Sequence, residues 1–157
     1  MRESIGAFRF ASEGARADRE LALMAVEEDG LLLEHVVGGL RGDSEVAFAA
    51  VQQNGMALVY VVEDLRHDRE LVLAAVANSR VGLENSALEL RGDRELVLSA
   101  MRQCGTDLRH AAPELRADAE VVRAAVLQCG TEAFSHALGA AAADAGLRRV
   151  AAIVDLQ

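Results

Sequence analysis

The chain has 157 residues, of which 52% are hydrophobic and 26% charged, a composition typical of a folded globular protein and not of a disordered one. Its formal charge is −9 and all 16 basic residues are arginine, which disfavours a nucleic-acid partner. No apolar run approaches the roughly 18 residues of a membrane span, and the first residues lack the apolar centre of a secretory signal. We therefore expect a soluble protein of the cytoplasm or another intracellular compartment, although a targeting segment already removed would leave no trace.

The sequence repeats every 25 residues. Residues 66–76 read RHDRELVLAAV, and residues 91–101 read RGDRELVLSAM. Such self-similarity predicts a solenoid, because a unit of this size cannot bury its apolar face without neighbours. We expect one all-α domain over residues 1–157, an α-solenoid with a partial repeat at 1–15, repeats at 16–40, 41–65, 66–90, 91–115 and 116–141, and a C-terminal cap helix at 142–157.

Residues 1–15 are in register with the second half of a repeat. Phe8 lies 25 positions before Leu33, and Ala15 lies 25 positions before Leu40. The sequence thus begins within a repeat, and we expect this segment to be either a cap or the end of a longer array.

Each repeat begins with a predicted α-helix of about eleven residues. Five copies share Arg, then Asp, which is a good N-cap, and then Glu, which favours the positive end of the helix dipole. The apolar positions of the first copy are Leu21, Ala22, Ala25 and Val26, an arc wide enough to contact both neighbours and a second layer. Four copies end at Gly30, Gly55, Gly105 or Gly130, which predicts a left-handed residue after the helix.

The second half of each repeat carries an apolar stripe with i, i+3, i+4, i+7 spacing. In the first copy it is Leu33, Val36, Val37 and Leu40, which predicts a short α-helix or 3₁₀ helix of one to two turns. Leucine-rich repeats have a similar period, but their L-x-x-L-x-L-x-x-N strand signature is missing and Ala-Ala-Val segments favour helix.

Later copies depart from the pattern. Arg80 replaces the glycine of the third copy, with Gly82 nearby, so we expect a rearranged helix end there. In the fifth copy the stripe slips by one residue, to Phe134, Ala137, Leu138 and Ala141, and Asp144 follows Asp118 by 26 positions. The cap helix has Leu147, Val150, Ala151 and Val154 on one face.

The pattern L-R-x-D-x-E-[LV]-V-L-x-A-V-x-x-[NC]-G-x-x-L, followed by an apolar stretch and E-L, resembles a family of tandem helical repeats known as a domain of unknown function, common in protists and found in some bacteria. The resemblance covers roughly residues 4–140 and implies helical repeats without catalytic residues. The architecture is also similar to leucine-rich variant repeats, which alternate a helix with a 3₁₀ turn and can carry an iron–sulfur cluster on clustered cysteines, a cluster that this chain lacks.

The usual chemical motifs are missing, so we expect no catalytic residue, cofactor or metal. RGD occurs at 41–43 and 91–93, but other copies read RAD or RHD, which assigns the Asp to capping. Cys104 and Cys129 are one repeat apart, about 8–10 Å in a stack, which is too far for a disulfide. His35 and His110 lie three units apart and cannot share a metal. The repeated Asp/Glu pairs are interpreted as caps and as ion-pair ladders with the repeated Arg.

The remaining candidate for function is an acidic surface on the second halves. These segments hold eight acidic residues and one basic residue, Arg109. Stacking would align the acidic residues into a ridge, beside a variable column that we expect to be exposed. The acidic residues are Glu34, Glu63, Asp64, Glu84, Glu89, Asp107, Glu114 and Glu132, and the column is His35, Tyr60, Asn85, His110 and Ser135.

Two interpretations of this surface stay open. It could be a binding face for a protein with a basic surface, which makes the chain a non-catalytic scaffold. It could equally be a solvated face that keeps the protein in solution. A structural subunit of a larger assembly is the close alternative to a scaffold, and it predicts an apolar end face. An enzyme or a nucleic-acid-binding repeat protein fits the sequence less well.

Overall fold

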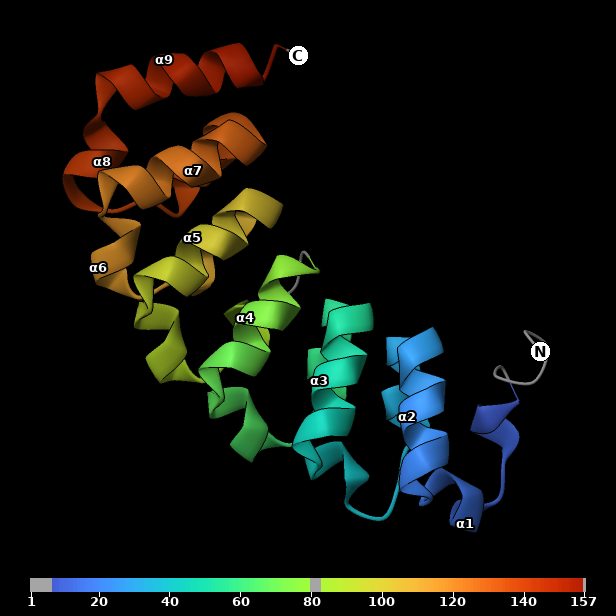
Figure 1. The fold of residues 1–157 in the computed structure, drawn as a ribbon. Helices are drawn as coiled ribbons and strands as arrows, with labels where there is room; N and C mark the ends of the chain where they lie inside the picture. The colour runs from blue at the N-terminus through green and yellow to red at the C-terminus, as the bar shows by residue number, and fades with distance from the viewer. Residues whose placement is uncertain (1–6, 80–82, 157) are drawn as a thin grey trace. The chain divides into compact units, whose positions relative to one another are not determined.

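The computed structural model describes residues 7–79 and 83–156, and every regular element in these ranges is a helix. The chain divides into two compact units, residues 1–79 and 80–157. In unit 1, the α-helices α2, α3 and α4 lie side by side (Figure 1). The elements of unit 1 are η1 (Phe8–Phe10), α1 (Glu13–Arg16), α2 (Arg19–Glu28), η2 (Gly30–His35), η3 (Leu40–Gly42), α3 (Ser44–Gln53), η4 (Gly55–Tyr60), η5 (Glu63–His67) and α4 (Arg69–Ala77), where η marks a 3₁₀ helix.

Unit 2 repeats this arrangement, with α5, α7 and α9 side by side (Figure 1). Its elements are η6 (Leu83–Asn85), η7 (Leu88–Gly92), α5 (Arg94–Gln103), η8 (Gly105–His110), α6 (Pro113–Arg116), α7 (Ala119–Cys129), η9 (Gly130–Ser135), α8 (Gly139–Ala143) and α9 (Ala145–Val154). The all-α repeat fold predicted from the sequence is therefore confirmed. The rearrangement predicted around Arg80 and Gly82 lies outside the described residues.

The long α-helices begin where the Asp pattern predicted. In α3, the carboxylate of Asp43 accepts hydrogen bonds from the backbone N–H groups of Glu45 and Val46, at 3.0 and 3.1 Å. This satisfies donors at the helix start that have no partner within the helix. The same N-cap recurs at Asp18, Asp68, Asp93, Asp118 and Asp144.

The reason predicted for the repeated glycines was wrong at three of four positions. Only Gly130 has a positive φ, of 57°, whereas Gly30, Gly55 and Gly105 do not. These three are buried at the start of a 3₁₀ helix, against the backbone of the next α-helix. A Cβ on Gly55 would overlap the carbonyl oxygen of Ala75 and lie 2.9 Å from its carbon. Glycine is therefore required by the close approach of two repeats and not by a left-handed turn.

The second half of a repeat is not one short helix but two pieces joined by an extended link. In the second copy η4 ends at Tyr60, Val61 and Val62 are extended, and η5 follows. Because the chain turns within the stripe, Leu58 and Val61 are buried while Val62 is 38% exposed. Ala57, outside the predicted stripe, is buried as well.

The link is tied to the start of its own repeat by one backbone hydrogen bond. Val37 N–H donates to the carbonyl of Arg16 at 3.1 Å, and Ala112 N–H donates to that of Arg91 at 2.9 Å. In the fifth copy this donor is Leu138 instead of residue 137, at 2.8 Å from the carbonyl of Arg116. The predicted slip by one residue is thus present in the backbone.

The C-terminal helix α9 packs on α7. Leu147 and Ala151 are buried, while Val150 and Val154 are half-buried. Asp155 follows this helix, and its carboxylate accepts a hydrogen bond from the hydroxyl of Thr131 at 2.7 Å. Thr131 lies at the start of η9. The α9 helix therefore continues the stack of unit 2 beyond α7.

Candidate functional site

Tyr60, in the predicted variable column, lies beside the preceding repeat. Its hydroxyl is close to the carboxylate of Glu34, and its ring is half-buried. Burial and the Glu34 charge hold the pKa of Tyr60 above its usual value. The guanidinium of Arg41 donates to the backbone carbonyl of Glu34. Two predicted site residues are therefore brought together, in a contact that links repeats.

The same arrangement recurs in unit 2 with histidine in place of tyrosine. His110 Nε2 lies 3.5 Å from the carboxylate of Glu84, and Arg91 donates to the carbonyl of Glu84 at 3.0 Å. Burial first, and then the nearby Arg109, hold the pKa of His110 below its usual value. Arg109 donates to His110 Nε2 at 2.8 Å, which fits a neutral imidazole. The contact with Glu84 becomes an ion pair only when His110 is protonated.

The rest of the column does not match the predicted exposure either. His35 and Asn85 are half-buried like Tyr60 and His110, and only Ser135 is exposed. All five residues end a 3₁₀ helix, so the position in the element does not by itself decide which of them is exposed. The amide nitrogen of Asn85 is buried and has no hydrogen-bond partner among the described residues.

One of the eight acidic residues of the second halves is buried, and the others are exposed. All are exposed except Asp107, which is 6% exposed and belongs to the interior of unit 2. They occupy two places: Glu34 and Glu84 lie on the 3₁₀ helix after the glycine, whereas Glu63, Asp64 and Glu89 lie on the piece that leads into the next α-helix. They therefore form separate groups within each unit.

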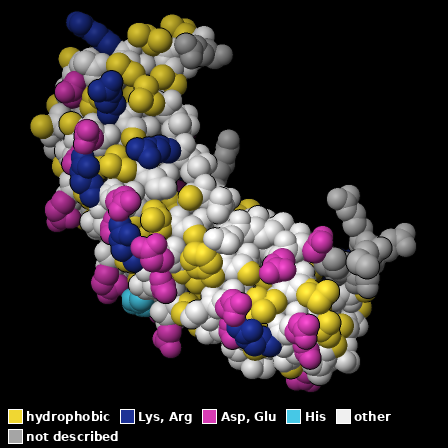
Figure 2. All heavy atoms as spheres, in the orientation of Figure 1, with side chains coloured by type: hydrophobic (Ala, Val, Ile, Leu, Met, Phe, Trp, Pro, Cys, Tyr) yellow, Lys and Arg dark blue, Asp and Glu magenta, His cyan; other side chains and the backbone are white. Residues whose placement is uncertain are grey.

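Acidic charge is concentrated in unit 1. Its sequence carries 14 acidic and seven basic residues, compared with 11 and nine in unit 2. On the face visible in Figure 2, arginine side chains alternate with carboxylates over unit 2, while carboxylates predominate over unit 1. The excess of acidic over basic residues is therefore larger in unit 1.

The repeated arginines have a function that the sequence analysis assigned wrongly. They were predicted to form ion-pair ladders, but they bind backbone carbonyls instead. Arg66 donates to the carbonyls of Val61 and Val59 at 3.0 and 2.8 Å. These oxygens lie at the end of η4, so each arginine closes the carboxyl end of a 3₁₀ helix. Arg41 and Arg91 make the same bonds to the preceding 3₁₀ helix, whereas Arg16 and Arg116 donate to carbonyls at the end of the following one, at His35 and His136.

Ion pairs between repeats are made by a different arginine, one that varies along the chain. Arg19 at the start of α2 pairs with Asp43, at 2.9 Å, and with Glu45 at the start of α3. Arg94 pairs in the same way with Asp118, at 3.3 Å, and with Glu120. The Arg19 hydrogen bond holds the pKa of Asp43 below its usual value. Because Ser44 and Ala119 replace this arginine in other copies, the variation was a usable signal.

Other candidate groups show no convergent chemistry. Cys104 and Cys129 are free thiols, and burial together with Glu132 raises the pKa of Cys129 to about 11. Within residues 7–79 and 83–156, no three His, Cys, Asp or Glu side chains are grouped to hold a metal. In the same ranges, no helix has both the length and the apolar character to cross a membrane. Asp43, of the first RGD, is a half-buried cap paired with Arg19.

Comparison with known proteins gives one result. No curated protein and no solved structure matches the chain. A family model described as a domain of unknown function, DUF4116, matches three times in tandem, at residues 18–61, 43–91 and 93–138. Each match spans nearly two of the 25-residue units, and together they cover most of the sequence. The chain therefore belongs to the DUF4116 family of tandem helical repeats.

Proposed function

We propose that the protein is a non-catalytic scaffold that binds a protein partner with a basic surface through the exposed carboxylates of its second halves. The observation that carries this proposal is the exposure of Glu63 and Asp64 beside the excess of acidic residues in unit 1. Within the described ranges, neither carboxylate pairs with an arginine. Both are therefore open to a cation from another molecule.

The expected mode of binding is electrostatic attraction followed by anchoring. Clustered carboxylates accelerate the encounter with a basic protein, and this effect weakens as salt is added. Half-buried Tyr60, beside Glu34, offers the kind of aromatic edge that contributes to affinity at interfaces. Glu84 and Glu89 offer a second, weaker acidic place in unit 2.

A structural subunit of a larger assembly is the second candidate. Its support is different, because it concerns an apolar end and not the acidic side. Leu21 and Met24 of α2 are 44% and 56% exposed. Exposed apolar side chains that lie together are typical of surfaces that another chain covers.

Affinity capture from a lysate of the source organism tests the scaffold proposal. The baits are the wild type, a Glu63→Gln/Asp64→Asn variant, and a Glu27→Gln/Glu28→Gln control that makes the same charge change in unit 1 on the exposed side of α2, outside the second halves. We expect a basic protein to be retained by the wild type and the control, released by moderate salt, and lost by the first variant. Equal capture by all three folded baits would refute the role of the acidic surface.

A further inference from the structure

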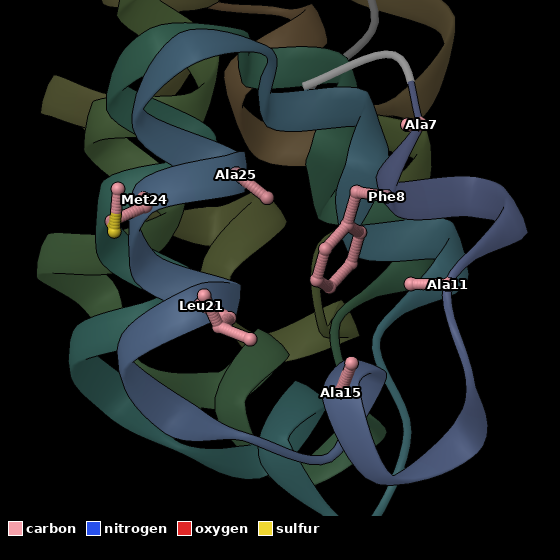
Figure 3. A pocket seen from close by; sticks show the side chains of 7 residues that line it. All are labelled: Ala7, Phe8, Ala11, Ala15, Leu21, Met24 and Ala25. Atoms are coloured by element: carbon pink, nitrogen blue, oxygen red, sulfur yellow. The ribbon is translucent and has the colours of Figure 1, made fainter. Parts of the chain in front are cut away.

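The end of unit 1 carries an open apolar pocket of about 230 Å³. Leu21, Met24 and Ala25 of α2 form one side, and Phe8 and Ala15 of the short N-terminal pieces form the other (Figure 3). The ring of Phe8 points into the space beside α2 and is 8% exposed. The pocket therefore has a fixed floor and an open, apolar rim.

Repeat register explains why this face is open. Position 21 corresponds to Val46, Leu71 and Val121 in α3, α4 and α7, whose side chains are 0%, 2% and 0% exposed. In α3 and α4 the preceding α-helix of unit 1 covers this face, as α5 covers that of α7 in unit 2. Among the described residues, only the short pieces η1 and α1 precede α2, and Leu21 is 44% exposed. The face is thus shaped for an α-helix in the position that α2 occupies on α3.

The charges beside the pocket match such a helix. Where α2 meets α3, Arg19 bonds the N-cap Asp43 and also Glu45, and Arg94 does the same to Asp118 and Glu120. The corresponding acceptors on α2 are Asp18 and Glu20, both exposed and without a cationic partner among the described residues. An arginine arriving with a docked helix would meet this acidic pair.

We propose that the free face of α2 binds an amphipathic α-helix from a partner protein, whose contacting residues follow the pattern Arg, apolar at +3, apolar at +7. This pattern is the one that the chain uses internally. Arg19, Ala22 and Val26 face α3, and Arg94, Val97 and Met101 face α7; the four apolar residues are all 0% exposed. The pocket binds the apolar side chains, and Asp18 with Glu20 binds the arginine. This site is separate from the acidic surface of the proposed function.

A second copy of this chain fits the face less well. The free C-terminal helix α9 starts with the N-cap Asp144, so Ala145 occupies the position of the arginine and Arg148 that of the first apolar residue. Arg148 already lies over the ring of Phe134, at 5.3 Å, and donates to the carbonyl of Ala142. End-to-end stacking would therefore bring an arginine against the apolar pocket.

The probe for this site is a synthetic peptide of residues 92–103, GDRELVLSAMRQ, held helical by a hydrocarbon staple on the side away from Arg94, Val97 and Met101. Binding to the intact chain is measured by fluorescence anisotropy, and the site is mapped by amide chemical shifts. The test variant is Leu21→Asp. The matched control is Met56→Asp, because Met56 is 47% exposed in the same unit but lies on η4. Circular dichroism verifies that both variants fold.

We expect the peptide to shift the amide signals of α2. Leu21→Asp should weaken the affinity for the peptide about tenfold or more, and Met56→Asp should leave it unchanged. Glu20→Arg should weaken binding of this peptide, and a peptide with Arg94→Glu should restore it. No binding by the stapled helix, equal loss in both variants, or shifts outside α2 would overturn the proposal. The proposal would also be overturned if the chain alone sediments as a dimer and Leu21→Asp converts it to a monomer. The face would then bind a second copy of the chain. Loss of the acidic-surface partner in the capture experiment leaves these results unaffected.

Discussion

Replacing Gly55 by alanine tests whether two repeats approach as closely as the structure has them. In an ordinary helix this change stabilises a protein by about 0.5–1 kcal/mol, because glycine is the more flexible residue when unfolded. Here the new methyl group would overlap the carbonyl oxygen of Ala75 and lie 2.8 Å from the Cβ of Ser79. The neighbouring atoms are backbone or the first atom of a side chain, so a change of rotamer cannot relieve the overlap.

The free energy of unfolding should therefore fall by about 1–3 kcal/mol, the cost of overpacking a tight interior. Gly14→Ala is the control, since no atom lies within 4 Å of its added Cβ, and it should be neutral or slightly stabilising. Asparagine separates the two explanations for the repeated glycine. It tolerates left-handed backbone better than alanine, so it should be the milder change at Gly39, where φ is 81°, and the more damaging one at Gly55.

Urea unfolding measures these differences within unit 1. Tyr60 is the only tyrosine and the chain has no tryptophan, so its fluorescence follows unit 1, while circular dichroism follows both units. If Gly55→Ala unfolds at the same urea concentration as the wild type, the close approach is not tight. If asparagine is better tolerated than alanine at Gly55, the left-handed explanation was correct after all.

Three further predictions follow from individual side chains. Arg66→Lys should lower the free energy of unfolding by about 1–2 kcal/mol, nearly as much as Arg66→Ala. The reason is that an ammonium cannot bind two carbonyls as the planar guanidinium does. Urea unfolding of both variants measures the difference. The pKa of His110 is lowered in the folded chain, so the unfolded chain takes up the proton first and the free energy of unfolding falls as pH drops below about 6.5. The change in urea midpoint between pH 7.5 and 5.5 should therefore be smaller in His110→Gln than in the wild type. An equal change in both would contradict the assignment. In a Cys104→Ser chain, alkylation of Cys129 by iodoacetamide should be slow at pH 8 and keep accelerating toward pH 11, whereas a rate that levels near pH 9 would show an ordinary thiol.

The α-helices and their caps could be predicted because the signals are local. An Asp before a helix acts on N–H groups two or three residues away, so position in the sequence determines the contact. The glycines gave a false reason because their constraint comes from the next repeat, about 20 residues further along. Gly55 meets Ala75, and a single sequence does not distinguish that contact from a left-handed turn. The break in the second half was missed for a related reason, since an apolar stripe of four residues fits either one helix or two short pieces.

The repeated arginines were also misinterpreted from the sequence. Repetition at fixed spacing suggested ion pairs with the repeated Asp and Glu, because opposite charges in register invite that interpretation. The fixed arginine instead binds backbone carbonyls at the end of a 3₁₀ helix, either the preceding one, as Arg66 does, or the following one, as Arg16 does. The ion-pairing position, at Arg19 and Arg94, instead varies along the chain and is serine in the second copy. Invariance here accompanies a backbone contact, and variation accompanies a side-chain contact.

That distinction changes how the variable column should be interpreted. Variation among His35, Tyr60, Asn85, His110 and Ser135 was taken as a sign of recognition, on the assumption that the column is exposed. Tyr60 and His110 instead contact Glu34 and Glu84, each 26 positions earlier, whereas the residues at the same separation before His35 and Asn85 are Arg9 and Val59. The residue 26 positions before Ser135 is Arg109, and Ser135 is exposed. Part of the variation therefore matches one repeat to the next. Glu63 and Asp64 have no such match within unit 1, which makes them the better place to look for a partner.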